Sequence, residues 1–385
     1  MTMPIAPTSS RSASSASATG TDAVAEACAA AVESLDNDLG LLVCFTSGLD
    51  DARRAATQLG TAGGGAPSVG MTGKGIFAAN EPIDEGCVAV AFDKAIECGL
   101  GVGGNAATDF RAAGHDAARA AVAQLCNPAE LLMLFVDTRA GDLADAIAGA
   151  YEVSGPDVPM AGGAASGPDP TQFAHGEALT DAVVAVALRS ERPIGVGNAH
   201  SCSVVGEPSV VTSSEGQLIA EIDGRPAEEV YLQRVGGKEQ ISDEAFEAMA
   251  ITHPLAQPEA HGNRRLRHIL GRSPEGGLLC STHIPAGAAI EFTVLSLDEL
   301  VRSGWDSVTS SVESLGNHEP EAALVFDCAG RRRVLGHGQA QEVKAITDSF
   351  GDPPPLAGLY TDGEVARTSG PKGDHNHAVV TVTFA

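Results

Sequence analysis

The sequence is poor in aromatic residues and in positive charge. Phe, Trp and Tyr make up 4% of its 385 residues, with a single Trp, and 24 Lys and Arg face 50 Asp and Glu, which gives a formal net charge of −26. Nucleic acids and anionic membrane surfaces are bound through clustered Lys and Arg. We therefore expect no nucleic-acid partner and no membrane partner, and an acidic surface that favours solubility.

Long apolar segments are also missing. No run approaches the roughly 18 residues that cross a bilayer, and the Ser- and Ala-rich segment 1–20 lacks the apolar stretch of a secretory signal. The eight cysteines form no Cys-x-x-Cys pair, and several lie inside apolar runs, which is typical of buried free thiols in a reducing compartment. These absences predict a cytoplasmic protein with a disordered tail over residues 1–20. A cleaved transit peptide is disfavoured because Arg11 is the only basic residue there.

What the sequence does contain is one pattern written three times. An apolar, β-rich run is followed by a stretch of helical period, a Pro-x-x-Gly turn, a glycine-containing loop and an alternating strand. The first runs are Leu41–Ser47, Leu131–Thr138 and Ala323–Ala329; the loops are Gly70–Gly75, Gly162–Gly167 and Gly358–Glu364; the last strands are Val88–Phe92, Val183–Leu188 and Val379–Phe384. Internal repetition indicates a modular architecture, and this order of elements is an α/β module.

The length and the 43% hydrophobic content fit two hydrophobic cores. We predict an α/β fold with mixed sheets, in which two fused domains are built from the repeated module. After the second repeat a β-rich, turn-rich block passes into a helix that begins near Arg225. We place the domain boundary there, with one domain over 21–228 and the other over 229–385.

Four stretches carry a family resemblance. They are Pro159–Ala165, Cys202–Gly206 followed by Asp223–Ala227, Phe326–Arg331, and Tyr360–Glu364 followed by His375–His377. In this order, over about Leu39 to the end of the chain, they resemble the FIST family, the F-box and intracellular signal transduction sensory proteins with paired FIST N and FIST C domains.

The resemblance implies a sensory protein that binds a small ligand, such as an amino acid, and takes part in signal transduction. Some family members are described as haem-associated gas sensors, and relatives occur fused or adjacent to signalling output modules. No kinase, cyclase or F-box segment is visible in this sequence. We therefore expect a sensor rather than an enzyme, with its output through a separate signalling partner.

The glycine loops are the predicted ligand site. Ligands of α/β sheets lie beyond the carboxyl ends of strands, and glycine lets backbone N–H groups approach an anion such as a carboxylate. The alternative is that Pro-x-x-Gly only turns the chain. Glu364 offers a partner for the ammonium of an amino acid, or for Arg331. The predicted contacts from the loops are Gly70, Thr72, Gly162, Gly163, Tyr360, Gly363 and Glu364.

Two cysteines are candidates beside these loops. Cys328 lies three residues before Arg331, whose guanidinium would lower the pKa of the thiol and favour redox sensing. Cys202 is a similar but weaker candidate. The alternative is a buried cysteine at the end of a strand. A cysteine-dependent enzyme, with Cys328 as nucleophile and His375 or His377 as base, is the competing functional class.

Histidines near the C-terminus raise a cofactor question. His375 and His377 share one face if a strand begins there, and we add His375 and Asn376 to the predicted ligand site. No further metal ligands can be named, so we predict no metal site. Haem ligation by His175, His200 or His375 stays open as an alternative, although the sequence has no Cys-x-x-Cys-His.

One further motif has two interpretations. Gly99-x-Gly101-x-x-Gly104 matches the dinucleotide-binding pattern between a strand and a helix, but the acid that should follow about 20 residues later is missing at that distance. A strand-to-helix turn is the simpler reading.

Overall fold

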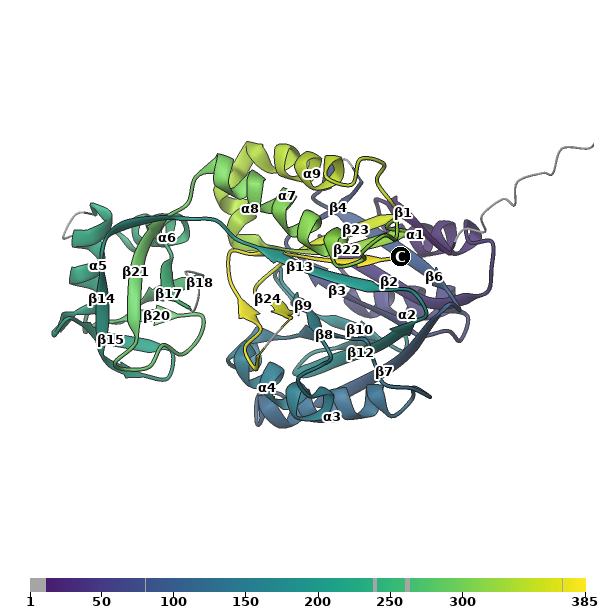
Figure 1. Ribbon diagram of the computed structural model, residues 1–385, viewed down its shortest axis with the longest axis horizontal. Coiled ribbons are helices and arrows are strands. Elements are labelled where there is room, and N and C mark those ends of the chain that lie inside the picture. The colour runs from purple at the N-terminus through teal and green to yellow at the C-terminus, as the bar shows by residue number, and fades with distance from the viewer. Residues whose placement is uncertain (1–11, 80, 238–240, 260–263, 369) are drawn as a thin grey trace, which may run out of the picture.

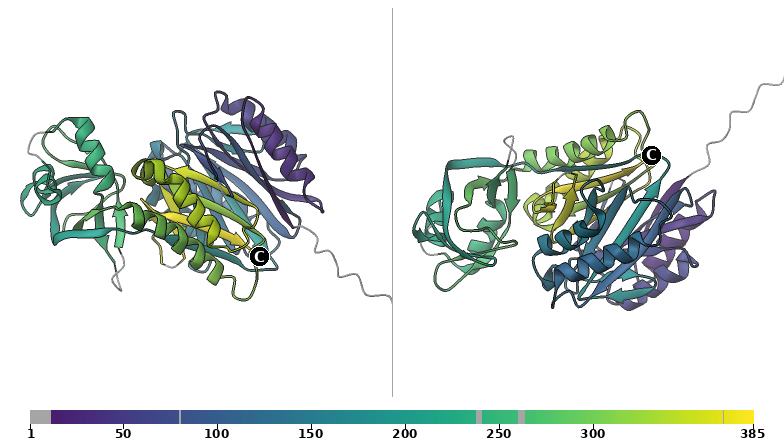
Figure 2. Two further views of the ribbon diagram at one scale, coloured as in Figure 1. Left: turned by 90° about the horizontal axis from the view of Figure 1, so that it is seen from above. Right: turned by 60° about the horizontal axis from the view of Figure 1, so that its bottom comes forward.

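The structure is a computed structural model that describes residues 12–79, 81–237, 241–259, 264–368 and 370–385. It shows a large body, formed by residues before 200 and after 295, and a smaller lobe formed by residues 203–295 (Figure 1). The two further views in Figure 2 keep the lobe at one end of the body. The predicted α/β class with mixed sheets is confirmed.

The body consists of three copies of one unit: edge strand, helix, strand, helix, strand, hairpin, strand. Repeat 1 is β1 (Ala13–Ala18), α1 (Ala23–Glu33), β2 (Leu39–Ser47), α2 (Ala52–Gly63), β3 (Ser68–Gly73), β4 (Ile76–Ala78), β5 (Glu81–Ile83) and β6 (Gly86–Asp93). Repeat 2 is β7 (Ile96–Gly104), α3 (Phe110–Val122), β8 (Leu131–Val136), α4 (Leu143–Ser154), β9 (Met160–Ala164), β10 (Gln172–Ala174), β11 (Glu177–Leu179) and β12 (Ala182–Ser190).

Repeat 3 is interrupted by the lobe, which is inserted between its edge strand and its first helix. The repeat is β13 (Ile194–Ala199), α7 (Leu297–Glu313), β22 (Ala322–Cys328), α8 (Ala329–Leu335), α9 (Gln339–Asp348), β23 (Leu356–Thr361), β24 (Glu364–Arg367), β25 (Asp374–His375) and β26 (Val379–Phe384). The lobe is β14 (Ser203–Glu215), β15 (Leu218–Ile222), β16 (Arg225–Pro226), α5 (Ala227–Val235), α6 (Asp243–Thr252), β17 (Leu255–Pro258), β18 (Arg264–Arg267), β19 (Ile269–Arg272), β20 (Leu278–Cys280) and β21 (Ala289–Val294).

The three repeats exchange their hairpins in a cycle. The three sheets have the orders β1-β6-β2-β3-β10-β11, β7-β12-β8-β9-β24-β25 and β13-β26-β22-β23-β4-β5. The hairpin of repeat 1 therefore completes the sheet of repeat 3, that of repeat 2 completes the sheet of repeat 1, and that of repeat 3 completes the sheet of repeat 2. Each repeat leaves one sheet edge that only another repeat closes.

A triangle of phenylalanines fills the centre of this arrangement. Phe45 in β2, Phe135 in β8 and Phe326 in β22 occupy the same position in their repeats and are 0% exposed. Their ring centroids lie 5.5 to 6.2 Å apart, mostly in edge-on geometry. Such aromatic pairs stabilise a core beyond their area, so three of the few aromatic residues strengthen the packing where the three sheets meet.

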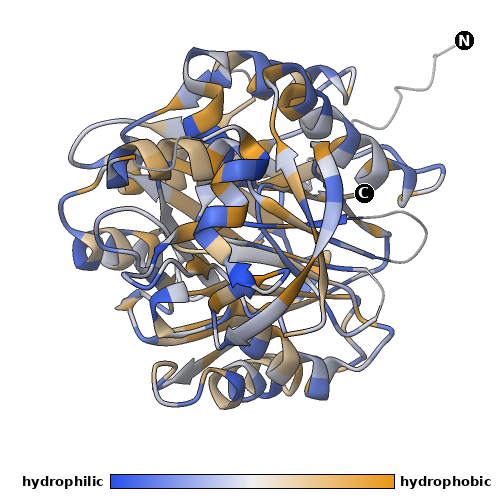
Figure 3. Ribbon diagram, turned by 90° about the vertical axis from the view of Figure 1, so that its left-hand side faces the viewer, coloured by the Kyte–Doolittle hydropathy of each residue, from blue (hydrophilic) through white to orange (hydrophobic). Residues whose placement is uncertain are grey.

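The outer helices are amphipathic, and coloured by hydropathy they carry both polar and apolar segments (Figure 3). Close packing of α3 on β7 depends on glycine. A Cβ on Gly99, Gly101 or Gly103 would lie 1.9 to 2.1 Å from a backbone carbonyl oxygen of α3. Gly99 and Gly101 of the dinucleotide-like motif therefore lie inside a strand and make room for a helix, as does Gly103, whereas nothing lies within 4 Å of the Cβ position of Gly104.

Several local predictions need correction. Ala13–Ala18 forms β1, paired with β6, so the predicted tail is wrong for these residues, and its residues 1–11 lie outside the described chain. Gly162 and Gly163 lie in strand β9 rather than in a loop. The sequence pattern gave no helix over Ala329–Leu335, where α8 begins directly after β22. The polar, arginine-rich stretch of α8 lacks the apolar period that identifies a helix.

All eight cysteines are free, and five of them are buried, as expected for most of the thiols. Among the helices of the described residues, none is both long enough and apolar enough to cross a membrane.

Candidate functional site

A cavity of about 680 Å³ lies between the lobe and the body. The body contributes the segments that follow β3, β8, β22 and β23, with Lys74, Thr138, Cys328 and Gly363 among the lining residues, and the lobe contributes His268 and Ser281. The volume falls within the range of small-molecule sites. The cavity thus lies beyond the carboxyl ends of strands, where α/β sheets bind ligands.

The loops of the three repeats meet beside this cavity. The backbone N–H of Lys74 donates to the carbonyl oxygen of Tyr360 at 3.1 Å and to the Ser166 hydroxyl at 2.8 Å. The N–H of Ala164 donates to the carbonyl oxygen of Gly363 at 2.8 Å. These bonds hold segments of repeats 1, 2 and 3 against one another beside the cavity, whose lining includes Lys74 and Gly363.

Positive charge gathers at the cavity although the chain is strongly acidic. Lys74 forms an ion pair with Asp362 at 2.8 Å. The Arg332 guanidinium lies 5.3 Å above the Tyr360 ring and pairs with Asp84. Arg333 is exposed, and within the described chain no side chain pairs with it. One cation at the cavity is thus left for a ligand.

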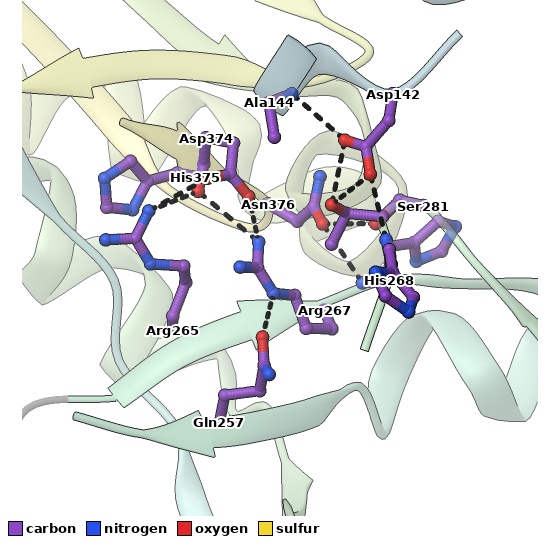
Figure 4. A network of polar contacts seen from close by, with 12 residues as sticks. Asp142, Ala144, Gln257, Arg265, Arg267, His268, Ser281, Asp374, His375 and Asn376 are labelled. Carbon is purple, nitrogen blue, oxygen red and sulfur yellow. Dashed lines mark hydrogen bonds and ion pairs between the residues drawn. The ribbon is translucent and has the colours of Figure 1, made fainter. Parts of the chain in front are cut away.

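On the lobe side, polar side chains from both bodies meet (Figure 4). The His268 backbone N–H donates to Asn376 Oδ1 at 3.3 Å, and the Ser281 hydroxyl donates to the same oxygen. His268 Nδ1 lies 3.2 Å from His377 Nε2. Burial, followed by the charges of Lys74 and Arg333, lowers the pKa of His268 to about 4, so this imidazole is neutral at physiological pH.

Two ionic contacts fix the lobe to the body. Asp374 accepts from Arg265 at 3.2 Å and also pairs with Arg267. Burial would raise the pKa of Asp374, but Arg267 and Arg265 outweigh it and hold the pKa below its ordinary value. Asp142, which caps α4, also accepts from the Thr282 hydroxyl at 2.7 Å. Asp374 and Asp142, which both belong to the body, thus bind side chains of the lobe near the cavity (Figure 4).

Cys328 lines the cavity, but the expected activation by Arg331 is wrong. Burial, and then the charge of Glu364, raises the pKa of the Cys328 thiol well above its ordinary value, and backbone N–H groups of Arg331, His377 and Gly330 offset this only in part. The Arg331 side chain is fully buried and bonds to Asp327 at 2.9 Å and to Glu342. Its charge is therefore already matched, and it does not line the cavity.

Glu364 and Tyr360 are also buried away from the cavity. Glu364 bonds to the Thr361 hydroxyl at 3.0 Å and accepts from the Ala378 N–H at 3.2 Å, and no Arg331 ion pair reaches it among the described residues. Burial raises its pKa well above the ordinary value. Tyr360 is 0% exposed, and its ring makes a cation–π contact with the Arg332 guanidinium.

The glycines of the first two loops serve close packing. A Cβ on Gly70 would lie 1.9 Å from the Cys44 carbonyl oxygen, and one on Gly162 would lie 2.1 Å from that of Leu134. A Cβ on Gly163 would lie 2.9 Å from Thr361. The Thr72 hydroxyl donates to the Ser166 carbonyl at 3.1 Å and so ties repeats 1 and 2 together. Of the predicted site residues, the cavity lining holds Cys328, Gly363 and Asn376.

The histidines proposed for haem lie elsewhere. His375 and His200 border a hollow of about 400 Å³ that also contains Arg264, Arg265, Lys372 and Glu259. This lining is charged, whereas a haem needs a mainly apolar slot, so these residues do not fit the group. His175 is exposed at the β10–β11 turn. Cys202 is half-buried beside this region, and burial raises its pKa to about 11.

Another hollow of about 680 Å³ lies at the opposite ends of the strands. Its cations are already paired: Arg192 with Glu321, Arg189 with Glu130, and Lys94 with Asp38. The cavity at the lobe differs because Arg333 is unpaired there.

Sequence reasoning missed the charged half of the cavity. Arg332 and Arg333 belong to a run of three arginines in a chain with few cations, which is a signal that composition alone offers. Lys74 lies in the first glycine loop but was not among the predicted contacts, and His268 carries no local signal because the lobe brings it to the site.

Comparisons with known proteins agree with the resemblance in the sequence. A family model described as the FIST N domain matches residues 40–225, and one described as the FIST C domain matches residues 227–367. The F-box in the longer form of the family name is withdrawn, since both matches are to FIST domains. The predicted boundary at 228 stays a prediction.

Two curated relatives are uncharacterized mycobacterial proteins. One from Mycobacterium tuberculosis is 26% identical over 234 residues, which is 57% of this chain and 58% of the relative. One from Mycobacterium bovis is 27% identical over 243 residues, which is 60% of this chain and 61% of the relative. The matches thus span about three fifths of the length of these relatives.

Proposed function

The chain belongs to the FIST family, whose domains are associated with sensory functions in signal transduction, and from this premise we propose that it is a sensor for a small ligand that carries a carboxylate, such as an amino acid. The ligand site is the cavity between the lobe and the body. The output passes to a separate signalling partner, in keeping with a cytoplasmic location.

The observation that carries the proposal is the unpaired Arg333 at a cavity shared by two bodies. Arg333 lines this cavity, is exposed, and pairs with no carboxylate of the described residues. A guanidinium binds a carboxylate through two parallel hydrogen bonds. Arg333 is therefore the proposed contact for the ligand carboxylate.

The rest of the lining suits an amino acid. Asp362 offers a carboxylate for the ammonium group, next to Lys74, which balances its charge. Leu143, Ile251 and Leu270 supply apolar surface for a side chain. The lining therefore offers polar and charged groups for the two ends of an amino acid and a smaller apolar surface for its side chain.

Signalling would follow from the shared lining. The lobe is joined to the body through the segments between β13 and β14 and between β21 and α7, and ligand contacts to both bodies favour one relative arrangement of them. A ligand shifts such an equilibrium only by its difference in affinity for the two states. The partner protein would read the favoured state.

The test is a thermal-shift screen of the purified chain against amino acids. We expect a rise in Tm with at least one of them, because a ligand at 100 times its Kd adds about 2.7 kcal/mol of stability. Arg333→Gln should weaken binding roughly 10- to 100-fold, since a hydrogen bond to a charged group contributes about 1.5–3 kcal/mol. Arg53→Gln, an exposed arginine of α2 far from the lining, is the matched control.

Silence across the whole screen would contradict the sensor proposal. If the Arg333→Gln variant bound the ligand as tightly as the wild type, the sensor proposal would stand but Arg333 would not be the contact for the ligand carboxylate.

A cysteine-dependent enzyme is the second candidate, and one observation favours it. A Cβ placed on Gly330 would lie 3.3 Å from Cys328 Sγ and 3.4 Å from His377 Nδ1, a ring nitrogen that has no hydrogen-bond partner within the described chain. Against it, burial lowers the pKa of His377 and raises that of Cys328, so neither base nor nucleophile is activated. Ester turnover that disappears in Cys328→Ala would favour the enzyme.

A further inference from the structure

Three cysteines of repeat 1 meet in the core between α1 and the first sheet. Cys28 lies on α1, Cys44 on β2 and Cys87 on β6, and each is 0% exposed. The three sulfur atoms lie within 4.8 Å of one another, and those of Cys44 and Cys87 are 3.3 Å apart. Three elements thus direct one thiol each to a single point.

The equivalent positions in the other two repeats hold aliphatic side chains, so packing of the core does not require cysteine there. Cys44, Leu134 and Val325 each come directly before the central phenylalanine of their repeat. The residue after that phenylalanine pairs across the sheet with Cys87 in repeat 1, with Val183 in repeat 2 and with Val379 in repeat 3. Two of the three thiols therefore replace aliphatic side chains.

The third thiol follows the same rule. Cys28 lies three residues before Ala31, whose carbonyl oxygen accepts from Ser14 in β1. Ala118 and Val308 lie three residues before Ala121 and Ser311, whose carbonyl oxygens contact the edge-strand glycines of their repeats. The buried trio is Ala118, Leu134 and Val183 in repeat 2, and Val308, Val325 and Val379 in repeat 3. The fold therefore packs at this place without thiols.

The surroundings of the cluster restrict what it can bind. The other buried residues of this core are apolar, such as Val24, Leu42, Leu59 and Phe173. Among the described residues, no cationic group acts on the pKa of any of the three thiols, which respond only to burial and to one another. Three thiolates around a monovalent or divalent ion would leave a buried negative charge without a partner, which is costly. Three thiolates around a trivalent centre leave none.

We propose that Cys28, Cys44 and Cys87 form a binding site for a trivalent thiophilic metalloid, with arsenite as its probe. Arsenous acid would react with three thiols to give a tris-thiolate of arsenic and three water molecules. Three As–O and three S–H bonds break, three As–S and three O–H bonds form, and arsenic stays trivalent. Thiolate sulfur is the ligand that soft centres prefer.

Entry to this site requires local opening, because the sulfur atoms are fully buried. Helix α1 covers the cluster from one side, so its transient detachment from the sheet would expose the thiols. Local openings of this kind occur in native proteins. Binding should therefore be slow in buffer and faster in urea below the unfolding transition.

The test uses the full chain, reduced and then freed of reductant under anaerobic conditions. After incubation with arsenite, native mass spectrometry should show one arsenic per chain with the loss of three protons, and X-ray absorption should show three sulfur neighbours. The triple variant Cys28→Val, Cys44→Val, Cys87→Val installs the trio of repeat 3 and should lose this species. Cys98→Ser with Cys126→Ser should retain it.

If the triple variant fails to fold, Cys44→Val alone serves, since two thiols cannot give three sulfur neighbours. Arsenic retained by the valine variants, or coordination by two sulfurs only, would overturn the proposal. The proposal would also be overturned if arsenite failed to bind even when the chain is refolded in its presence. Tight binding of Cu(I) or Zn²⁺ by a chain that does not bind arsenite would overturn it as well.

Discussion

In repeat 3, the spacing of buried ionisable side chains in the sequence does not predict which of them form ion pairs. Arg331 was expected to act on Cys328 three residues earlier, yet its partner on β22 is Asp327, four residues away, with Glu342 of α9 as the second. The guanidinium satisfies a buried acidic cluster. The spacing of Cys328 and Arg331 in the sequence identifies them as possible partners. The carboxylates that the fold places beside Arg331 decide which pair forms.

Glu364 gives a pH prediction at this scale. Burial raises its pKa well above the ordinary value, so the folded chain holds a proton that the unfolded chain has released above a pH of about 4.3. Stability from this group is complete below that pH and falls as the pH rises towards the folded pKa, by about 1.4 kcal/mol per pH unit.

Glu364→Gln keeps partners for Thr361 and Ala378 but cannot ionise. Its free energy of unfolding relative to the wild type should rise as the pH increases above about 4.3, as measured by urea denaturation. Glu313→Gln, at an exposed end of α7, controls for the loss of an acidic side chain. A difference that is flat with pH would contradict the assignment.

At the scale of elements, glycine marks where helices lie close on edge strands. The pairs α3 on β7 and α7 on β13 use the same device: a Cβ on Gly101 or Gly197 would lie 2.1 Å from a carbonyl oxygen of the helix. The sequence showed the glycines of β7 as a possible nucleotide motif. Gly99 and Gly101 lie inside a strand and face a helix, which gives these two a packing role.

The motif contains its own matched pair for a test. Gly101→Ala should destabilise the chain by about 1–3 kcal/mol, because the new methyl group overpacks the α3 interface. Gly104→Ala should change stability by less than about 0.5 kcal/mol, since nothing lies within 4 Å of its Cβ position. Chemical denaturation of both variants checks this. Equal effects would show that packing against α3 is not what selects glycine.

At the scale of the whole molecule, the exchanged hairpins make the repeats interdependent. Hairpin β4–β5 of repeat 1 pairs with β23, and β24 pairs with β9, so the N-terminal and C-terminal halves share two sheets. Phe326 of repeat 3 completes the central triangle with Phe45 and Phe135. A family boundary in the sequence is thus compatible with one shared core.

A fragment of residues 21–228 should therefore not fold on its own. It would leave the edge of β9 open, hairpin β4–β5 without its sheet, and the Phe45–Phe135 pair uncovered on one side. We expect aggregation or a broad, non-cooperative melting transition, measured by size-exclusion chromatography and calorimetry beside the full chain. A monomeric fragment with a sharp transition would show that the N-terminal domain is autonomous.

The sequence by itself determined the threefold repetition, the type and order of most elements, and the family. These follow from local signals, namely apolar periods, turn residues and short motifs. The tertiary structure decided which sheet each hairpin joins, that the lobe is inserted into repeat 3, and that Lys74, Arg333 and His268 face one cavity. Those outcomes depend on contacts between residues far apart in the chain, which no local pattern encodes.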